Sequence, residues 1–167
     1  MLNRYGLIAI RLKSVLTIED IGRKLDIKID RHDTLQFMRA LQADENRIGL
    51  YENNLLLCTD DSFGFFIEQL EGLPARILST FSSEKICAVY YYSVVDLYGY
   101  SYFDNGRRIR TKYGEHEDVW VDIGENLSIE KESQSIIDVE SWIIEQVTAM
   151  TLGHFTGIKM AKFELNA

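Results

Sequence analysis

The chain has 167 residues, of which 46% are hydrophobic and 26% charged, and its formal net charge is −8. This composition argues against disorder, and we expect residues 1–167 to form a single globular domain. The negative charge argues against nucleic-acid and membrane partners, because both attract a positive field.

The N-terminal stretch is not expected to be a signal peptide or a membrane span, because Arg11 and Lys13 interrupt its apolar run. Cys58 and Cys87 lie in separate apolar runs without a metal-binding spacing, so we expect both to be buried free thiols. Together these features predict a cytoplasmic protein.

The first third of the chain predicts a strand followed by two helices. Hydrophobic residues alternate along 7–16, which is typical of a half-buried strand. Thr17 with Asp20 resembles a capping box and predicts the start of a helix. Asp33 is placed to cap a second helix, with Gln36 at its third position.

The middle of the chain predicts a hairpin and an interrupted helical segment. Two apolar runs, 47–51 and 55–59, flank turn-forming residues and indicate paired strands. The segment 62–81 is helical in pattern. Within it Gly72 suits a C-terminal cap, and Pro74 suits the first turn of the next helix.

Asn105-Gly106 is the strongest hairpin signal in the chain, because a type I′ turn needs positive φ at both central residues. It follows a strand predicted at 86–92, and it implies that Asp104 lies opposite Arg107. Side chains alternate along strands, so the register predicts two different faces. One face carries tyrosines, namely Tyr98, Tyr100, Tyr102 and Tyr113. The other face carries the cations Arg108, Arg110 and Lys112.

The C-terminal part predicts a short strand at 119–123 that ends at Gly124, then a helix from Ser135, then a closing strand at 158–165. The apolar positions of that helix recur at helical spacing: Ile136, Val139, Ile143 and Val147. The fold class that follows is α+β, with an antiparallel sheet built from hairpins and helices packed on one side.

Charge is segregated around the hairpin. A basic strand is followed, between 114 and 130, by six carboxylates and no lysine or arginine. We interpret this as a solvated sheet face with cross-strand charge pairs, or alternatively as an anion-binding or partner-docking surface. The predicted register separates tyrosines from arginines, which argues against a surface that stacks nucleic-acid bases.

No motif for a metal, a cofactor or a nucleophile is present. His116 lies among carboxylates in a predicted turn, and the spacing fits neither a zinc nor a calcium site. The sequence has no nucleophile elbow and no glycine-rich phosphate loop. We therefore expect no metal, no cofactor and no catalytic residue.

Asp96 is an unusual carboxylate because it lies between Val95 and Leu97, on the predicted tyrosine face. A buried charge must be paired. Asp96 is therefore either a structural residue that binds a backbone amide or a cation, or part of a site.

One segment resembles a family. The residues that carry the resemblance are Ser93-Val94-Val95-Asp96, Asn105-Gly106, Ile109-Arg110, Asp122-Ile123-Gly124-Glu125, Leu127 and Glu130. They resemble an uncharacterised bacterial domain family that is frequent in actinobacteria and has no established function. The resemblance implies a shared fold and draws attention to Asp96, Arg110, Asp122, Gly124 and Glu125.

Our leading hypothesis is a non-enzymatic interaction or ligand-sensing domain with a protein or small-molecule partner. The alternative is a small-ligand binder or an enzyme with a cleft near Asp96, Arg110 and the Tyr98, Tyr100 and Tyr102 face. The candidate ligand-binding residues are Asp96, Arg110, Tyr98, Tyr100, Asp122 and Glu125. The sequence leaves the oligomeric state and the partner open.

Overall fold

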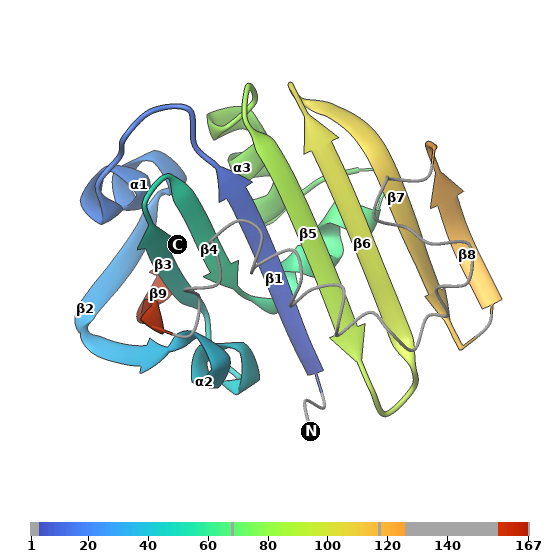
Figure 1. The fold of residues 1–167 in the computed structure, drawn as a ribbon, viewed down its shortest axis with the longest axis horizontal. Helices are drawn as coiled ribbons and strands as arrows, with labels where there is room; N and C mark the ends of the chain where they lie inside the picture. Colours follow the sequence, from blue (N-terminus) through green and yellow to red (C-terminus); the bar gives the residue numbers. More distant parts are fainter. Residues whose placement is uncertain (1–3, 68, 117, 126–156, 167) are drawn as a thin grey trace.

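The computed structural model describes residues 4–67, 69–116, 118–125 and 157–166, whose strands form one open antiparallel sheet (Figure 1). The strands are β1 (Arg4–Arg11), β2 (Ile27–Gln36), β3 (Arg47–Tyr51), β4 (Asn54–Cys58), β5 (Lys85–Tyr92), β6 (Leu97–Asp104), β7 (Arg107–Glu115), β8 (Asp118–Ile123) and β9 (Lys159–Leu165). Their order in the sheet is β2-β9-β3-β4-β1-β5-β6-β7-β8. The antiparallel sheet built from hairpins is confirmed.

Helices lie on both faces of this sheet. They are α1 (Ile18–Leu25), α2 (Phe37–Gln42), the 3-10 helix η1 (Asp60–Phe66) and α3 (Gly72–Thr80). Side chains of α1, η1 and α3 share one core with Ile8 and Ile10, whereas α2 shares the opposite core with Leu7 and Ala9. Figure 1 shows α3 behind the sheet. The expected packing of helices on one side is not confirmed.

Strand β1 is the centre of both cores. It pairs with β4 on one edge and β5 on the other. The side chains of Leu7, Ile8, Ala9 and Ile10 are all buried. The strand predicted here as half-buried is therefore covered on both faces, which is why its apolar run is continuous between 7 and 10.

The predicted start of α1 is confirmed. The Thr17 hydroxyl accepts the Asp20 amide at 3.1 Å, and the Asp20 carboxylate accepts the Thr17 amide at 3.0 Å. These two bonds satisfy donors that the first turn of a helix leaves unpaired.

The predicted start of the second helix is wrong. Asp33 lies within β2, and α2 begins only at Phe37, after Gln36 as an N-cap without a side-chain bond. The Asp33 carboxylate instead accepts a hydrogen bond from Arg47 at 2.8 Å. A long-range ion pair has replaced the local cap.

The middle segment differs in part from expectation. The β3–β4 hairpin is confirmed. Segment 62–81 contains the end of η1 and all of α3, and Gly72 opens α3 with φ +57° instead of capping a preceding helix. Pro74 does lie in the first turn of α3.

The Asn105-Gly106 turn is confirmed, with φ of 51° and 71°. The predicted register holds only for the first two pairs, Asp104 with Arg107 and Phe103 with Arg108. A β-bulge at Ile109 then moves the pairing by one residue.

The bulge changes which side chains share a face. Tyr102 lies opposite Arg110, and Tyr100 lies opposite Lys112. Arg110 and Lys112 therefore lie on the tyrosine face, and the prediction that separated tyrosines from these cations is wrong. A slip of one residue reverses the face of every later side chain.

The remaining predictions near the C-terminus have mixed outcomes. The strands β8 and β9 are confirmed. The helix predicted from Ser135, with its apolar stripe, lies outside the described residues. Within the part of the chain that the structure describes, no helix is long and apolar enough to cross a membrane.

Candidate functional site

Arg110 is the centre of the polar contacts at the β7–β8 end of the sheet. Its side chain is fully buried, and it forms an ion pair with the Asp122 carboxylate. Its Nη1 also donates to the carbonyl oxygens of Ile123 at 3.1 Å and Gly124 at 3.4 Å. The guanidinium lies 6.0 Å from the centre of the Tyr100 ring. Arg110 thus fastens the end of β8 to β7.

Gly124 allows this close approach. It has a φ of +85°, and a Cβ there would lie 1.9 Å from the Ile109 carbonyl oxygen. Only glycine combines that backbone conformation with the absent side chain. These residues form one unit, which we call the Arg110 clamp. It consists of Ile109, Arg110, Asp122, Ile123 and Gly124.

The candidate tyrosines are core residues. Tyr98 is 1% exposed and Tyr100 is 8% exposed. The Tyr98 hydroxyl has no hydrogen-bond partner among the described residues. Burial, followed by the charges of Asp122 and Asp118, raises the pKa of Tyr98 to about 12.

Asp96 lies in the turn between β5 and β6 and not in a strand. Its φ is +53°, and its side chain is 37% exposed. The carboxylate lies 3.4 Å from His116 Nδ1, and the Asp96 carbonyl accepts the His116 amide at 3.1 Å. The premise that Asp96 is a buried charge within a strand is therefore wrong.

The structure brings part of the predicted site together. Arg110 forms an ion pair with Asp122 in the clamp and lies beside the Tyr100 ring. The Asp96 carboxylate instead lies beside His116, and Glu125 is exposed. Arg110, Tyr98 and Tyr100 are all buried.

The opposite face of β7 carries a second arginine that sequence reasoning did not single out. Arg108 Nη1 donates to the Phe65 carbonyl at 2.6 Å, and Nη2 donates to the Ile67 carbonyl at 3.0 Å. Its guanidinium also lies 4.8 Å from the centre of the Phe103 ring. Arg108 thus ties the end of η1 to the sheet.

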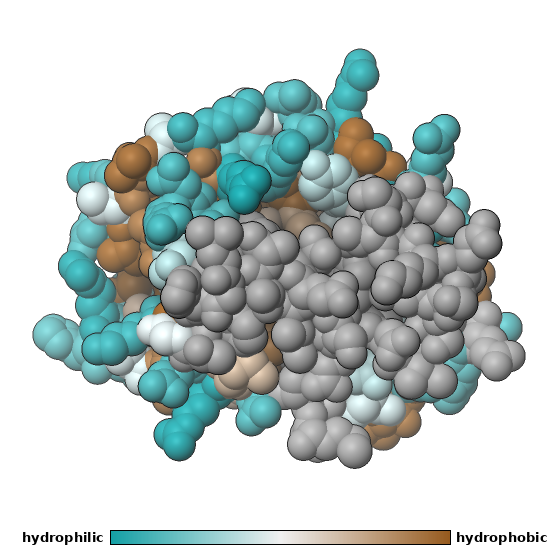
Figure 2. Space-filling model, in the orientation of Figure 1, coloured by the Kyte–Doolittle hydropathy of each residue, from teal (hydrophilic) through white to brown (hydrophobic). Residues whose placement is uncertain are grey.

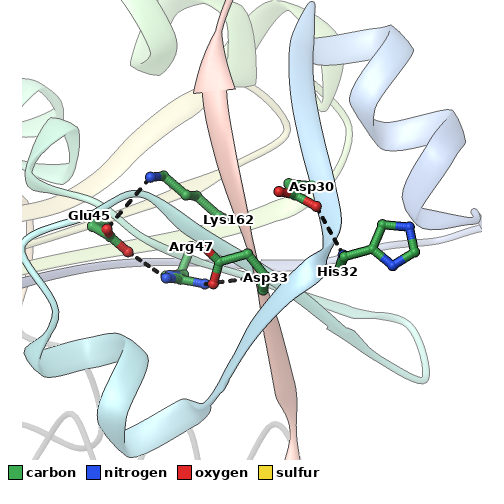
Figure 3. A network of polar contacts seen from close by, with 6 residues as sticks. All are labelled: Asp30, His32, Asp33, Glu45, Arg47 and Lys162. Carbon is green, nitrogen blue, oxygen red and sulfur yellow. Dashed lines mark hydrogen bonds and ion pairs between the residues drawn. The ribbon is translucent and has the colours of Figure 1, made fainter.

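A third arginine was also missed, at the other end of the sheet (Figure 3). The Arg47 side chain is 4% exposed and lies between the carboxylates of Asp33 and Glu45. Lys162 of β9 lies 3.6 Å from Glu45. Hydrogen bonding by Arg47, then the charge of Lys162, lowers the pKa of Glu45. This network links β2, β3 and β9.

Both cysteines are free, as predicted, but only Cys58 is buried, whereas Cys87, which was also expected to be buried, is half-buried. Burial raises the pKa of both thiols to about 12, although Arg47 opposes the rise at Cys58. A thiol with such a pKa is a poor nucleophile at neutral pH.

An aromatic row runs from the core to the exposed edge of the sheet. The Tyr90 ring contacts Phe63 at 5.3 Å, Phe63 contacts Tyr113 at 5.5 Å, and Tyr113 contacts Trp120 at 5.2 Å, all edge to face. Trp120, in β8, is 52% exposed. Its neighbours in β8, Val119 and Ile123, are 43% and 42% exposed. The row ends in an apolar surface on the last strand of the sheet.

Metal ligands do not gather in the part of the chain that is described. No group of three or more His, Cys, Asp and Glu side chains there could hold a metal ion. His116, which the sequence places among carboxylates, lies 3.4 Å from the carboxylate of Asp96 in the β5–β6 turn.

Comparison with known families gives one match. The model of a family of unknown function, DUF6928, matches residues 17–133, which include the Arg110 clamp and β8. The chain belongs to the DUF6928 family. The resemblance to an uncharacterised domain family is therefore confirmed. The match begins after β1 and ends before β9, although both strands lie inside the sheet.

No match was found among curated proteins or among solved structures. The function of this DUF6928 chain must therefore be argued from its own residues.

Proposed function

We propose that this chain is a non-enzymatic interaction domain that binds an extended, basic segment of a protein partner along β8. The observation that carries the proposal is the exposure of Trp120 and Ile123, two apolar side chains on the Tyr113 face of the last strand of the sheet. Apolar side chains that gather at an edge mark interaction surfaces more often than scattered ones do.

Trp120 has the properties of a binding anchor. Its ring is held edge to face by Tyr113, which is itself held by Phe63, so one side of the indole is positioned before a partner arrives. A preorganised aromatic side chain loses little entropy on binding, and tryptophan is enriched among residues that dominate interface energy.

The backbone of β8 supports an added strand. Among the described strands, β8 pairs with β7 alone and is the last in the sheet order. The outer edge of a terminal strand offers N–H and C=O groups to an extended peptide. Side chains of alternate peptide residues would then meet the apolar side chains of β8.

Charge favours a basic partner over a second copy of this chain. Asp118 and Asp122 are both exposed in β8, and Asp122 already forms an ion pair with Arg110. In an antiparallel pair of two β8 strands centred on Trp120, Asp118 of one copy would lie opposite Asp122 of the other, where a second carboxylate is unfavourable. A lysine or arginine of a basic partner opposite Asp118 would instead be attracted.

The buried polar groups support a non-catalytic role. Arg110 is committed to Asp122 and to the backbone of Ile123 and Gly124, and both thiols are held protonated by burial. Among these groups, Arg110 is thus engaged in holding β8 to β7, and the two thiols are poor nucleophiles at neutral pH.

The test is a calorimetric titration of the full chain with two synthetic peptides, one of alternating lysine and valine and one of alternating glutamate and valine. We expect the basic peptide to bind and the acidic one not to. Trp120→Ala should weaken binding at least about tenfold, and Val94→Ala, at a site that is 70% exposed in the β5–β6 turn, should not.

Three results would contradict the proposal. They are equal binding of both peptides, unchanged binding to Trp120→Ala, and a dimer that Trp120→Ala converts to a monomer. The last result would identify a second copy as the occupant. Light scattering of the free chain measures it directly.

A further inference from the structure

The two hairpins that contain β7 close on different charges. In the β6–β7 hairpin Asp104 lies opposite Arg107, whereas in the β7–β8 hairpin Glu115 lies opposite Asp118. Like charges directly opposite each other in an antiparallel pair are destabilising. Within the described part of the chain, neither of these two carboxylates forms an ion pair. The β7–β8 hairpin thus carries two negative charges that nothing described neutralises.

These carboxylates share a face with two aromatic rings. Side chains alternate along a strand, so Glu115 points to the same side as Tyr113, and Asp118 to the same side as Trp120. The centres of the Tyr113 and Trp120 rings are 5.2 Å apart. After burial, the charge of Glu115 is the next cause that raises the pKa of Tyr113. We call Glu115, Asp118 and Trp120 together the turn site.

The turn site lies on the face of the sheet that carries η1. Tyr113 packs against the core that η1 and α3 share, and Figure 1 shows α3 behind the sheet. The turn site therefore points away from the viewer in Figure 2, which shows the opposite face with its mostly hydrophilic described surface. Asp118 is exposed, Glu115 is half-buried and Trp120 is 52% exposed, so a partner can reach all three.

Arg110 shows what such a combination of groups can bind. On the opposite face of the same two strands, its guanidinium pairs with the Asp122 carboxylate and lies 6.0 Å from the centre of the Tyr100 ring. A guanidinium is planar, offers donors along more than one edge and stacks on aromatic rings, whereas an ammonium is a compact point charge. Tryptophan is the best aromatic partner for such a cation. The turn site offers the same kinds of group, and no described arginine pairs with its carboxylates.

We propose that the turn site binds an arginine side chain of the partner, which bridges the carboxylates of Glu115 and Asp118 and lies against the Trp120 ring. This proposal rests on the proposed docking along β8, and it names the residue that the partner must carry. Asp118 is the first residue of β8, so the arginine would lie at one end of the added strand.

Three capped peptides test the choice of side chain. Each alternates valine and serine and carries arginine, lysine or citrulline at both ends, so that the direction of the added strand does not matter. Citrulline has nearly the shape of arginine but no charge. In calorimetric titrations of the full chain, we expect the arginine peptide to bind at least about tenfold more tightly than the citrulline peptide, with lysine between them. Equal affinity of the arginine peptide and either of the others would overturn the proposal.

Variants locate the contact. Glu115→Gln and Asp118→Asn should each weaken binding of the arginine peptide by about threefold or more and leave the citrulline peptide unchanged. Asp44→Asn is the matched control, because it removes one charge from an exposed position between α2 and β3. It should change neither affinity. An equal loss in Asp44→Asn would reduce the effect to net charge and would overturn the turn site.

The free chain gives a second readout. Because Glu115 and Asp118 repel each other, Glu115→Gln should raise the melting temperature by up to about 4 °C, and Asp44→Asn should not. A lower melting temperature would show that Glu115 is already paired, which would overturn the proposal.

The peptides also separate this proposal from the docking function. If the three peptides bind equally and Trp120→Ala weakens all of them, docking along β8 stands and the arginine site fails. If no peptide binds, both fail.

Discussion

Position 124 requires a glycine. Its backbone has φ +85°, and its Cα lies so close to the Ile109 carbonyl that a Cβ has no room. The Arg110 guanidinium donates a hydrogen bond to the Gly124 carbonyl. Glycine at position 124 is thus needed for the chain after β8 to lie against Ile109 and Arg110.

Gly124→Ala should lower the free energy of unfolding by more than Gly72→Ala. Gly72 also has positive φ, at +57°, but no atom lies within 4 Å of a Cβ built there. Gly72→Ala should therefore cost only the backbone term of about 1–3 kcal/mol. Urea unfolding of both variants measures the difference, and equal losses would show that the Ile109 contact adds nothing.

Asp96→Asn should have a small effect. Asparagine tolerates the left-handed conformation that Asp96 adopts, so only the contact with His116 is altered. We expect a loss of at most about 1 kcal/mol, as for other exposed ion pairs. A stable Asp96→Asn variant that loses a specific ligand would show instead that Asp96 belongs to a site.

At the scale of elements, one turn and one helix cap could be predicted from sequence because their causes are local, whereas the caps expected at Asp33 and Gly72 were wrong. Asn105-Gly106 and the Thr17–Asp20 box each act within a few residues. The bulge at Ile109 has no such signal, since an isoleucine fits a regular strand equally well. The error in the register followed from that one residue.

The strand β2 was missed for a related reason. Four of the six residues in 28–33 are charged, and a register shift between Asp30 and Thr34 breaks the alternation that marks a strand. Asp33 could cap a helix locally, but its bond to the distant Arg47 depends on the tertiary fold. The pairing of Arg110 with Asp122 was partly anticipated by the adjacent basic and acidic blocks.

Trp120 should matter little for the stability of the sheet. It is half exposed on the last strand, whereas Phe65 of η1 is completely buried. Trp120→Ala is expected to cost less than about 1.5 kcal/mol, and Phe65→Ala about 3–5 kcal/mol. Thermal unfolding compares them. A loss at Trp120 as large as that at Phe65 would make Trp120 a core residue.

At the scale of the whole molecule, two strand-linking clusters hold opposite ends of one sheet. The Arg47 network joins β2, β3 and β9, and the Arg110 clamp joins β7 and β8. Between them, two cores cover the two faces. The proposed β8 surface lies at one end of the sheet, and Trp120 is not a member of either core.

The stability of the molecule should fall as pH rises from about 9 to 12. Cys58, Cys87 and Tyr98 have ordinary pKa values of 9.0 and 10.0, and burial raises each to about 12 in the folded protein. The folded state therefore holds these protons more tightly, so its advantage is complete below pH 9 and is lost as pH approaches 12. Urea unfolding at several pH values should show this decline, and Cys58→Ala should make it shallower. A flat profile would contradict the assigned burial.

The most direct test of peptide binding by β8 is to map the amide chemical shifts of the full chain on addition of the alternating lysine–valine peptide. We expect the largest shifts along β8, at Val119, Trp120 and Ile123, with smaller ones in β7. We also expect added salt to reduce these shifts, because the attraction is partly electrostatic. Shifts centred on any other element, or none at all, would contradict the claim that β8 is the docking strand.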